Sequence, residues 1–176
     1  MDEHLLEFPE MTQRRYSSRS FPPYRFIPGL APHPTRDPKG HSYNQEPDPL
    51  KSFDPDKWHS CEEYLYGIDL FNHGYWWEAH EALEAVWVAA GRRTKTGFFV
   101  QGLIQIAVAH LKKFQGLHDV ATRMAQTGLQ RMMPVNQVYL GIDMSRFRST
   151  VTAYFLEGNG KPVQVTLAHS PVGSFS

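Results

Sequence analysis

Cysteine is nearly absent from this chain, because Cys61 is the only one. No disulfide can form within the chain, and this composition is typical of a protein that folds in a reducing compartment. We therefore expect a cytoplasmic location. The N-terminal residues are acidic and include no basic stretch that leads into an apolar run, so we expect no signal peptide.

An excess of charge of either sign is also missing. Lys and Arg together number 18, and Asp and Glu together also number 18. Binding of nucleic acid through a broad basic field is therefore not expected. The longest apolar stretch, residues 103–109 with Gln105 inside it, is far shorter than the ~20 residues that cross a bilayer. We expect no membrane partner, and we find no phosphate-binding glycine loop, Cys-x-x-Cys pair or nucleophile elbow.

Proline is abundant, but mainly in the first third of the chain. Of the 13 prolines, all but three lie at or before Pro55, and their missing amide donors and ring clashes exclude a helix there. Aromatic and aliphatic residues between positions 21 and 43 make this segment too apolar for a solvated linker. We expect residues 1–54 to form an extended arm that packs on the body of the protein. The alternative is an unattached leader.

The arm contains a turn signal within residues 33–41. An Asp-Pro-x-Gly sequence that begins at Asp37 fits a type I turn. Such a reversal would bring His33 and His41 near each other. Together with Arg36 and Asp37, these two histidines are candidates for covering a site on the body.

The rest of the chain has the periodicity and the punctuation of helices. Asp54 and Pro55 supply an N-cap followed by proline at the first helical position. The expected helices cover about residues 56–72, 75–90, 94–114, 118–132 and 145–157. The third helix is apolar nearly all round and should be central, and short connections imply antiparallel neighbours.

The predicted fold class is therefore all-α. We expect an antiparallel bundle of about four to five helices over residues 55–157, preceded by the proline-rich arm and followed by a tail at 158–176. The alternation of apolar residues at 163–167 is too short to predict a strand.

Polar side chains interrupt two expected helices that are otherwise nearly all apolar. These side chains, with one adjacent tryptophan, are His80, Glu81, Glu84 and Trp87 on the second helix and Gln101 and Gln105 on the third. Polar groups in so apolar a setting need partners. If the two helices pack antiparallel, Gln105 can reach the strip formed by His80 and Glu84. Glu78 points away from this strip and is expected to be solvated.

Three interpretations of these residues remain open. The first is a structural polar network that fixes helix register. The second is a divalent-metal site, in which His80 and Glu84 converge from i, i+4 positions. The candidates for its third ligand are His33, His41 and His110. The third interpretation is a metal-free pocket for a small ligand, with Glu81 or Glu84 as general base.

A non-enzymatic interaction module is the rival to any of these sites. In that case the polar residues serve helix register only, and the Trp and Phe surface binds a protein partner or a second copy of the chain. The sequence does not say whether the protein is an enzyme.

Two motifs in order carry a family resemblance. The first, Trp-Glu-Ala-His-Glu-x-x-Glu-x-x-Trp, spans residues 77–87, and the second, Phe-x-Gln-Gly-Leu-Ile-Gln, spans residues 99–105. Over about residues 62–129 the chain resembles the domain of unknown function 309 family. The resemblance implies a small all-helical bundle and no particular activity. The residues that it carries over are Glu78, His80, Glu81, Glu84, Trp87, Gln101, Gly102 and Gln105.

Overall fold

The structure is a computed structural model that describes residue 8 and residues 14–168. Its elements are the 3₁₀ helix η2 (Pro55–Ser60), α1 (Glu62–Asn72), α2 (Trp76–Ala90), α3 (Lys95–Phe114), α4 (His118–Arg131), β1 (Val138–Tyr139), β2 (Ile142–Asp143), α5 (Met144–Val151) and the π-helical turn η3 (Thr152–Leu156). The all-α prediction is confirmed, because the two strands form only a small antiparallel hairpin. No helix within the described residues has the length and apolarity needed to cross a bilayer.

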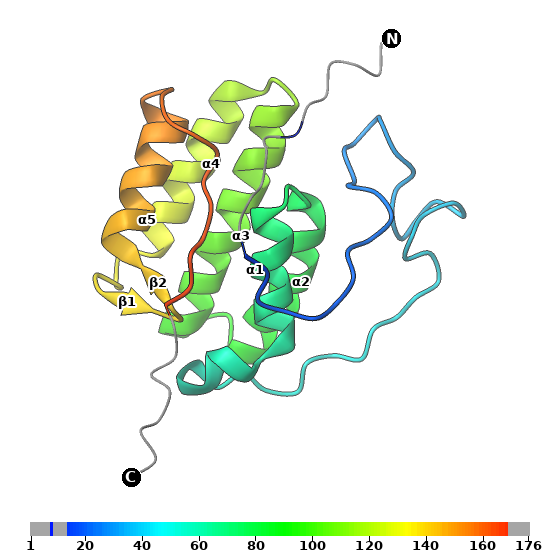
Figure 1. Cartoon of the computed structure of the whole chain (residues 1–176), viewed down its shortest axis with the longest axis horizontal. Helices are drawn as coiled ribbons and strands as arrows, with labels where there is room; N and C mark the ends of the chain where they lie inside the picture. Colours follow the sequence, from blue (N-terminus) through cyan, green and yellow to red (C-terminus); the bar gives the residue numbers. More distant parts are fainter. Residues whose placement is uncertain (1–7, 9–13, 169–176) are drawn as a thin grey trace.

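The helices pack in chain order around α3. Helix α1 lies against α2, α2 against α3, and α3 against α4. Figure 1 shows the arm on the α1–α2 side of the bundle and α5 on the α4 side. Gly102 permits the close approach of α3 to α4, because a Cβ atom there would lie 2.4 Å from Cγ of Met132. The prediction of a central third helix agrees with this arrangement.

Three of the expected helices match the structure closely. The ranges 75–90, 94–114 and 118–132 correspond to α2, α3 and α4 within about one residue at each end. Thr94 caps α3 as its residue type predicts, since its hydroxyl accepts a hydrogen bond from the amide of Gly97 at 2.9 Å. Gly74, with φ +78°, allows the sharp turn between α1 and α2.

The prediction of one continuous first helix over residues 56–72 is wrong. The chain forms η2, breaks at Cys61, where the backbone is extended at φ −89° and ψ 101°, and restarts as α1. Trp58 packs directly over Gly141, where a Cβ atom would lie 2.6 Å from the indole ring. Because Gly141 is distant in the sequence, local helical periodicity does not predict this contact of Trp58, which lies in η2 rather than in a continuous first helix.

The expected fifth helix, residues 145–157, also departs from a regular α-helix. Its first part is α5, and its last turn widens into η3. Side chains from α3 and α4 bind the carbonyl oxygens of this turn. Lys113 donates to the Tyr154 carbonyl at 2.6 Å and Thr122 donates to the Phe155 carbonyl at 3.0 Å. These contacts compensate for the altered helical hydrogen bonding.

The segment after η3 is extended, and its apolar residues alternate between core and surface. Val163, Val165 and Leu167 are buried, whereas Thr166 is exposed. The side chain of Asn72 donates to the Val165 carbonyl at 2.8 Å and accepts from the Val165 amide at 2.7 Å. The Asn72 side chain thus makes the two backbone hydrogen bonds that a neighbouring strand would make. The alternation of apolar residues at 163–167 reflects which side chains are buried, and the segment is not part of a sheet.

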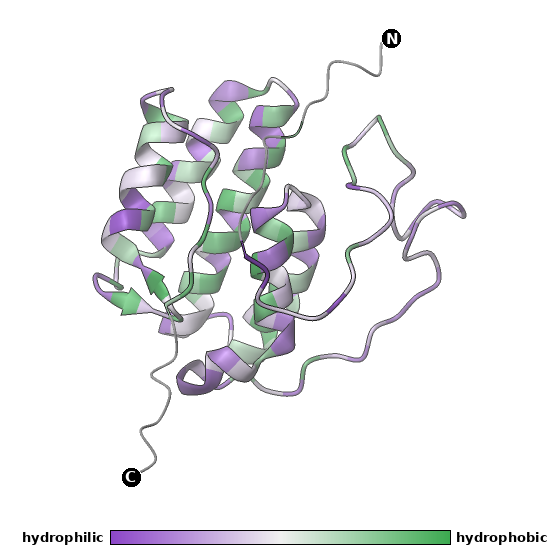
Figure 2. Cartoon of the chain, viewed as in Figure 1, coloured by the Kyte–Doolittle hydropathy of each residue, from purple (hydrophilic) through white to green (hydrophobic). Residues whose placement is uncertain are grey.

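The arm is held to α1 by a buried carboxylate. Asp69 is fully buried and accepts hydrogen bonds from the amides of Tyr16 at 2.7 Å and Ser17 at 2.9 Å, and from Nε of Arg15 at 3.2 Å. Figure 2 draws the arm largely in purple and pale colours, and these polar contacts act together with the burial of Phe26, Ile27 and Phe53 from the same segment. Charge-assisted hydrogen bonds of this kind are the stronger ones in proteins.

His110 lies in the core rather than at a site. Its ring stacks on Trp76 at 5.2 Å between centroids and also contacts Phe71 and Phe155. Neither ring nitrogen has a hydrogen-bond partner among the described residues. Burial, with a smaller contribution from Lys113, lowers the pKa of His110 to about 3. The third metal ligand proposed from the sequence is therefore not His110, because aromatic rings enclose it.

We predict that Asp69→Ala lowers the free energy of unfolding by about 2–4 kcal/mol, since it leaves two backbone amides without their acceptor. Trypsin should then cleave faster at the arm arginines. The matched control is Glu63→Ala, which removes a half-exposed ion pair with Arg19 and should cost at most about 1 kcal/mol. Urea unfolding and limited proteolysis measure both effects, and equal losses in the two variants would contradict the anchoring role.

We predict that His110 weakens the fold in acid. The unfolded histidine binds a proton near pH 6.5 and the folded one only near pH 3, so the unfolded state binds more protons between these values. Stability should fall by up to about 1.4 kcal/mol per pH unit below pH 6.5 from this residue alone. His110→Phe should remove this contribution in urea unfolding at pH 4–7. His118→Phe, at an exposed position, should leave the slope unchanged; parallel curves for wild type and His110→Phe would refute the prediction.

Candidate functional site

Three potential metal ligands converge on the outer surface of α2. One ligand atom from each of His80, Glu81 and Glu84 lies within 4.8 Å of the other two. Nδ1 of His80 is 3.4 Å from Oε1 of Glu81, and Nε2 of His80 is 3.7 Å from Oε2 of Glu84. The histidine side chain is 29% exposed and each carboxylate side chain 46%, so solvent and ions can reach the group. We call these three residues the α2 cluster.

The electrostatics of the α2 cluster favour a cation. Partial burial raises the pKa of Glu81, and the nearby negative charge of Glu84 raises it further. His80 and His33 act in the opposite direction. Two carboxylates held this close repel each other, and a bound divalent cation would offset that repulsion and lower the pKa of Glu81.

The two glutamines of α3 do not join the α2 cluster by hydrogen bonds within the described residues. Oε1 of Gln105 is buried and has no hydrogen-bond partner in the described part of the chain. Trp87, at the far end of the same α2 strip, has a buried indole nitrogen that also finds no hydrogen-bond partner among the residues the structure describes, and the Arg92 guanidinium lies 4.9 Å from its ring centre. The expected bond from Gln105 to the strip is thus not formed, and Gln101 makes none to it either.

Glu78 is buried, and the expectation that it is solvated is wrong. Its side chain is only 5% exposed, and its Oε1 accepts hydrogen bonds from the amide of Phe26 at 2.8 Å and from Nε2 of His41 at 3.2 Å. The helical geometry did place Glu78 away from the apolar seam of α2. The arm covers that face of the helix, which the helical periodicity alone does not reveal.

The arm loop forms the expected turn beside α2. The amide of Gly40 donates to the carbonyl of Asp37 at 2.8 Å, and the Asp37 side chain accepts from the amide of Lys39 at 2.8 Å. Arg36 is exposed. Neither Arg36 nor Asp37 forms a hydrogen bond or ion pair with the α2 cluster within the described residues, so their predicted role in covering the site remains a prediction.

The two arm histidines lie close to α2 but already have partners. His33 packs its ring edge-on to Trp77 at 5.4 Å, and its Nδ1 accepts from the amides of Thr35 and Arg36. The Nδ1 of His41 is 2.8 Å from the hydroxyl of Ser42, and its Nε2 contacts Glu78. Both nitrogens of His41 are therefore engaged, which argues against its use as a metal ligand.

A cleft of about 870 Å³ separates part of the arm from α1 and α2. The helices contribute Tyr66, Trp77, Glu78 and Glu81 to its walls, and the arm contributes Arg19 and His41. Glu81 therefore belongs both to the α2 cluster and to the lining of the cleft. The sequence predicted a pocket between the second and third helices. It predicted that the arm loop covers a site on the body, and two of its predicted site residues, His41 and Glu81, line this cleft, but it did not place the cleft between the arm and the α1–α2 pair.

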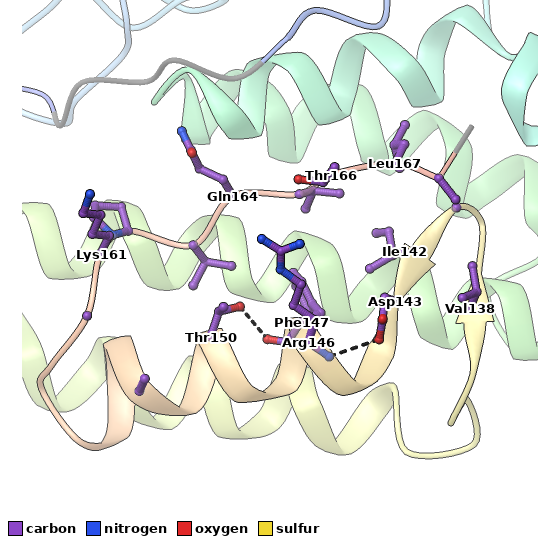
Figure 3. Close-up of a pocket in the computed structure, with 17 residues that line it drawn as sticks. Val138, Ile142, Asp143, Arg146, Phe147, Thr150, Lys161, Gln164, Thr166 and Leu167 are labelled. Carbon is purple, nitrogen blue, oxygen red and sulfur yellow. Dashed lines mark hydrogen bonds between the residues drawn. The ribbon is translucent and has the colours of Figure 1, made fainter. Parts of the chain in front are cut away.

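A second hollow, of about 460 Å³, lies between α5, β2 and the extended C-terminal segment. Figure 3 shows Arg146 projecting from α5 toward this segment, with Lys161 at the far end of the hollow. None of the site residues predicted from the sequence lines it.

The comparisons with known proteins agree with the helical body of the structure. The family described as domain of unknown function (DUF309) has a model that matches residues 64–124, which run from α1 into α4. A search of curated proteins found no match to the chain. The matched range includes the α2 cluster and both glutamines of α3, in agreement with the resemblance seen in the sequence. Residues 64–124 of the helical body are therefore similar to the family described as domain of unknown function (DUF309).

Proposed function

We propose that this protein binds one divalent metal ion through His80, Glu81 and Glu84. The observation that carries the proposal is the convergence of an imidazole and two carboxylates on one exposed turn of α2, with ligand atoms within 4.8 Å of one another. A single ion would use one nitrogen of His80, so small rotations of these half-exposed side chains would bring the three ligands together.

The donor set indicates the kind of ion. One imidazole and two carboxylates suit Zn²⁺ or Mn²⁺ better than Ca²⁺, which prefers oxygen ligands alone. Three protein ligands leave at least one coordination position for water or for a ligand. Because Glu81 also lines the cleft, such an ion would lie at the rim of a space that can hold a small molecule.

The structural-network interpretation has less support. A network that fixes register needs hydrogen bonds between helices, and in the described part of the chain none joins the α2 cluster to Gln101 or Gln105. The charged side chains of the cluster are also partly exposed, so they carry no strict need for buried partners.

The interaction-module hypothesis also has less support than the metal site. It calls for a contiguous apolar surface. The large exposed apolar side chains of the described residues come from segments that are separate in the sequence, namely the arm, α2, the turn before α4, the residues around β1 and the end of η3, and their exposure alone does not define one patch. A protein partner or a second copy of the chain stays a prediction, as does the cytoplasmic location that the single cysteine suggests.

We predict that untagged protein binds about one Zn²⁺ or Mn²⁺ per chain in isothermal titration calorimetry. His80→Ala should weaken this binding by at least about tenfold, because even changes outside the coordination sphere cost 10–100-fold in metal affinity. His118→Ala, which removes an exposed histidine from α4, should bind like the wild type. Equal binding by wild type and His80→Ala would exclude His80 as a ligand.

We predict that Glu84→Gln separates a metal site from a structural role. The side chain is 46% exposed, so the substitution should change the free energy of unfolding by less than about 0.5 kcal/mol. Metal affinity should fall, because a neutral amide replaces a charged ligand. Urea unfolding and calorimetry on the same preparation test both parts. A large loss of stability with unchanged metal affinity would favour the structural network instead.

A further inference from the structure

The cleft between the arm and the α1–α2 pair has a negative lining. Carboxylates enter its walls from both sides, and they are Glu46, Asp48, Glu63, Glu78 and Glu81. The basic residues among the described lining are Arg19 and His41. Arg19 is already paired with Glu63 at 3.0 Å. A volume of about 870 Å³ is in the range that holds small ligands. The charge of the lining disfavours anions and favours cations.

Glu78 is a lining residue with one satisfied and one unsatisfied carboxylate oxygen among the described residues. It is 5% exposed, and its Oε1 already accepts from the amide of Phe26 and from His41. Its other oxygen, Oε2, is buried and has no hydrogen-bond partner among the described residues. Buried carboxylate oxygens without a donor are uncommon, because water solvates them better than an apolar wall does. A donor from a ligand would supply what the arm leaves unsatisfied.

Aromatic rings complete the walls of the cleft. Tyr66 donates its hydroxyl to the carbonyl of Ser20 at 3.0 Å, which fixes its ring between α1 and the arm. Trp77 is held edge-on by Phe26 and His33. Fixed aromatic faces bind both the apolar body of a small molecule and a cationic group by cation–π attraction.

We propose that this cleft binds a small molecule with an ammonium or guanidinium group, which donates to Oε2 of Glu78 while its carbon skeleton packs on Tyr66 and Trp77. The bonds from Phe26 and His41 to Oε1 hold the carboxylate in place and leave Oε2 for the ligand. The proposal does not require a metal ion, since Glu78 is not part of the α2 cluster, although Glu81 belongs both to that cluster and to the lining of the cleft.

The test is calorimetry on the full chain, in buffer with a chelator so that no metal contributes. The probes are phenethylamine and agmatine, with 2-phenylethanol as the uncharged match of phenethylamine. Lysine blocked at both ends is added to distinguish a free amine from a peptide side chain. At least one amine should bind at least tenfold more tightly than the alcohol. Tryptophan fluorescence should respond to its binding, because Trp77 lines the cleft.

Two variants locate the binding. Glu78→Gln keeps an acceptor for the amide of Phe26 but removes the charge, so amine affinity should fall at least tenfold. Ala85→Leu fills the cleft from α2 without touching the Glu78 bonds and should have the same effect if Glu78→Gln fails to fold. Glu62→Gln, which changes an exposed carboxylate of α1 outside the lining, should bind amines like the wild type.

The proposal is overturned by any of three results. These are the absence of amine binding at millimolar concentration by folded wild type, equal affinity for amine and alcohol, and amine affinity that is unchanged in a folded Glu78→Gln or Ala85→Leu. Loss of metal binding in His80→Ala with retained amine binding would separate the two sites. Amine binding that fails while zinc binding persists would refute the cleft proposal alone.

Discussion

The attachment of the arm to the helices depends on two buried carboxylates. Asp69 on α1 receives two backbone amides and the Arg15 side chain, and Glu78 on α2 receives a backbone amide and His41. Each carboxylate is removed from water by the segment that donates to it, so burial of the charge and docking of the arm occur together. Without these contacts the cleft would lose its outer wall, and Glu78 would be a surface residue.

Helix α2 presents its polar residues in two directions. Glu78 faces the arm, whereas His80 and Glu84 lie on the exposed surface of the helix, and Glu81 lies between Glu84 and Glu78 around the helix axis. Because Glu81 is shared, the proposed ion and the proposed amine would lie next to each other along one helix. A ligand in the cleft is therefore placed to approach the open coordination positions of an ion, which links the two proposals spatially through Glu81.

Other polar residues in the apolar helices serve the fold. Asn72 substitutes for a strand by pairing with both backbone groups of Val165. His110 stays neutral in an aromatic enclosure, where it weakens the protein in acid. These cases show why a polar residue in an apolar helix does not by itself indicate a site. What distinguishes His80, Glu81 and Glu84 is that they converge and remain accessible.

The sequence by itself determined the helices, their approximate ends and the spacing of His80 and Glu84, because capping, glycine at φ above zero and helical periodicity act over a few residues. The tertiary structure decided the burial of Glu78, the partners of His41 and the break at Cys61. Glu78 binds Phe26 and His41, which lie 52 and 37 positions before it in the sequence. Trp58, close to the break at Cys61, contacts Gly141. Such contacts depend on how the arm and the C-terminal part of the chain fold back onto the bundle, and local patterns carry no record of that docking.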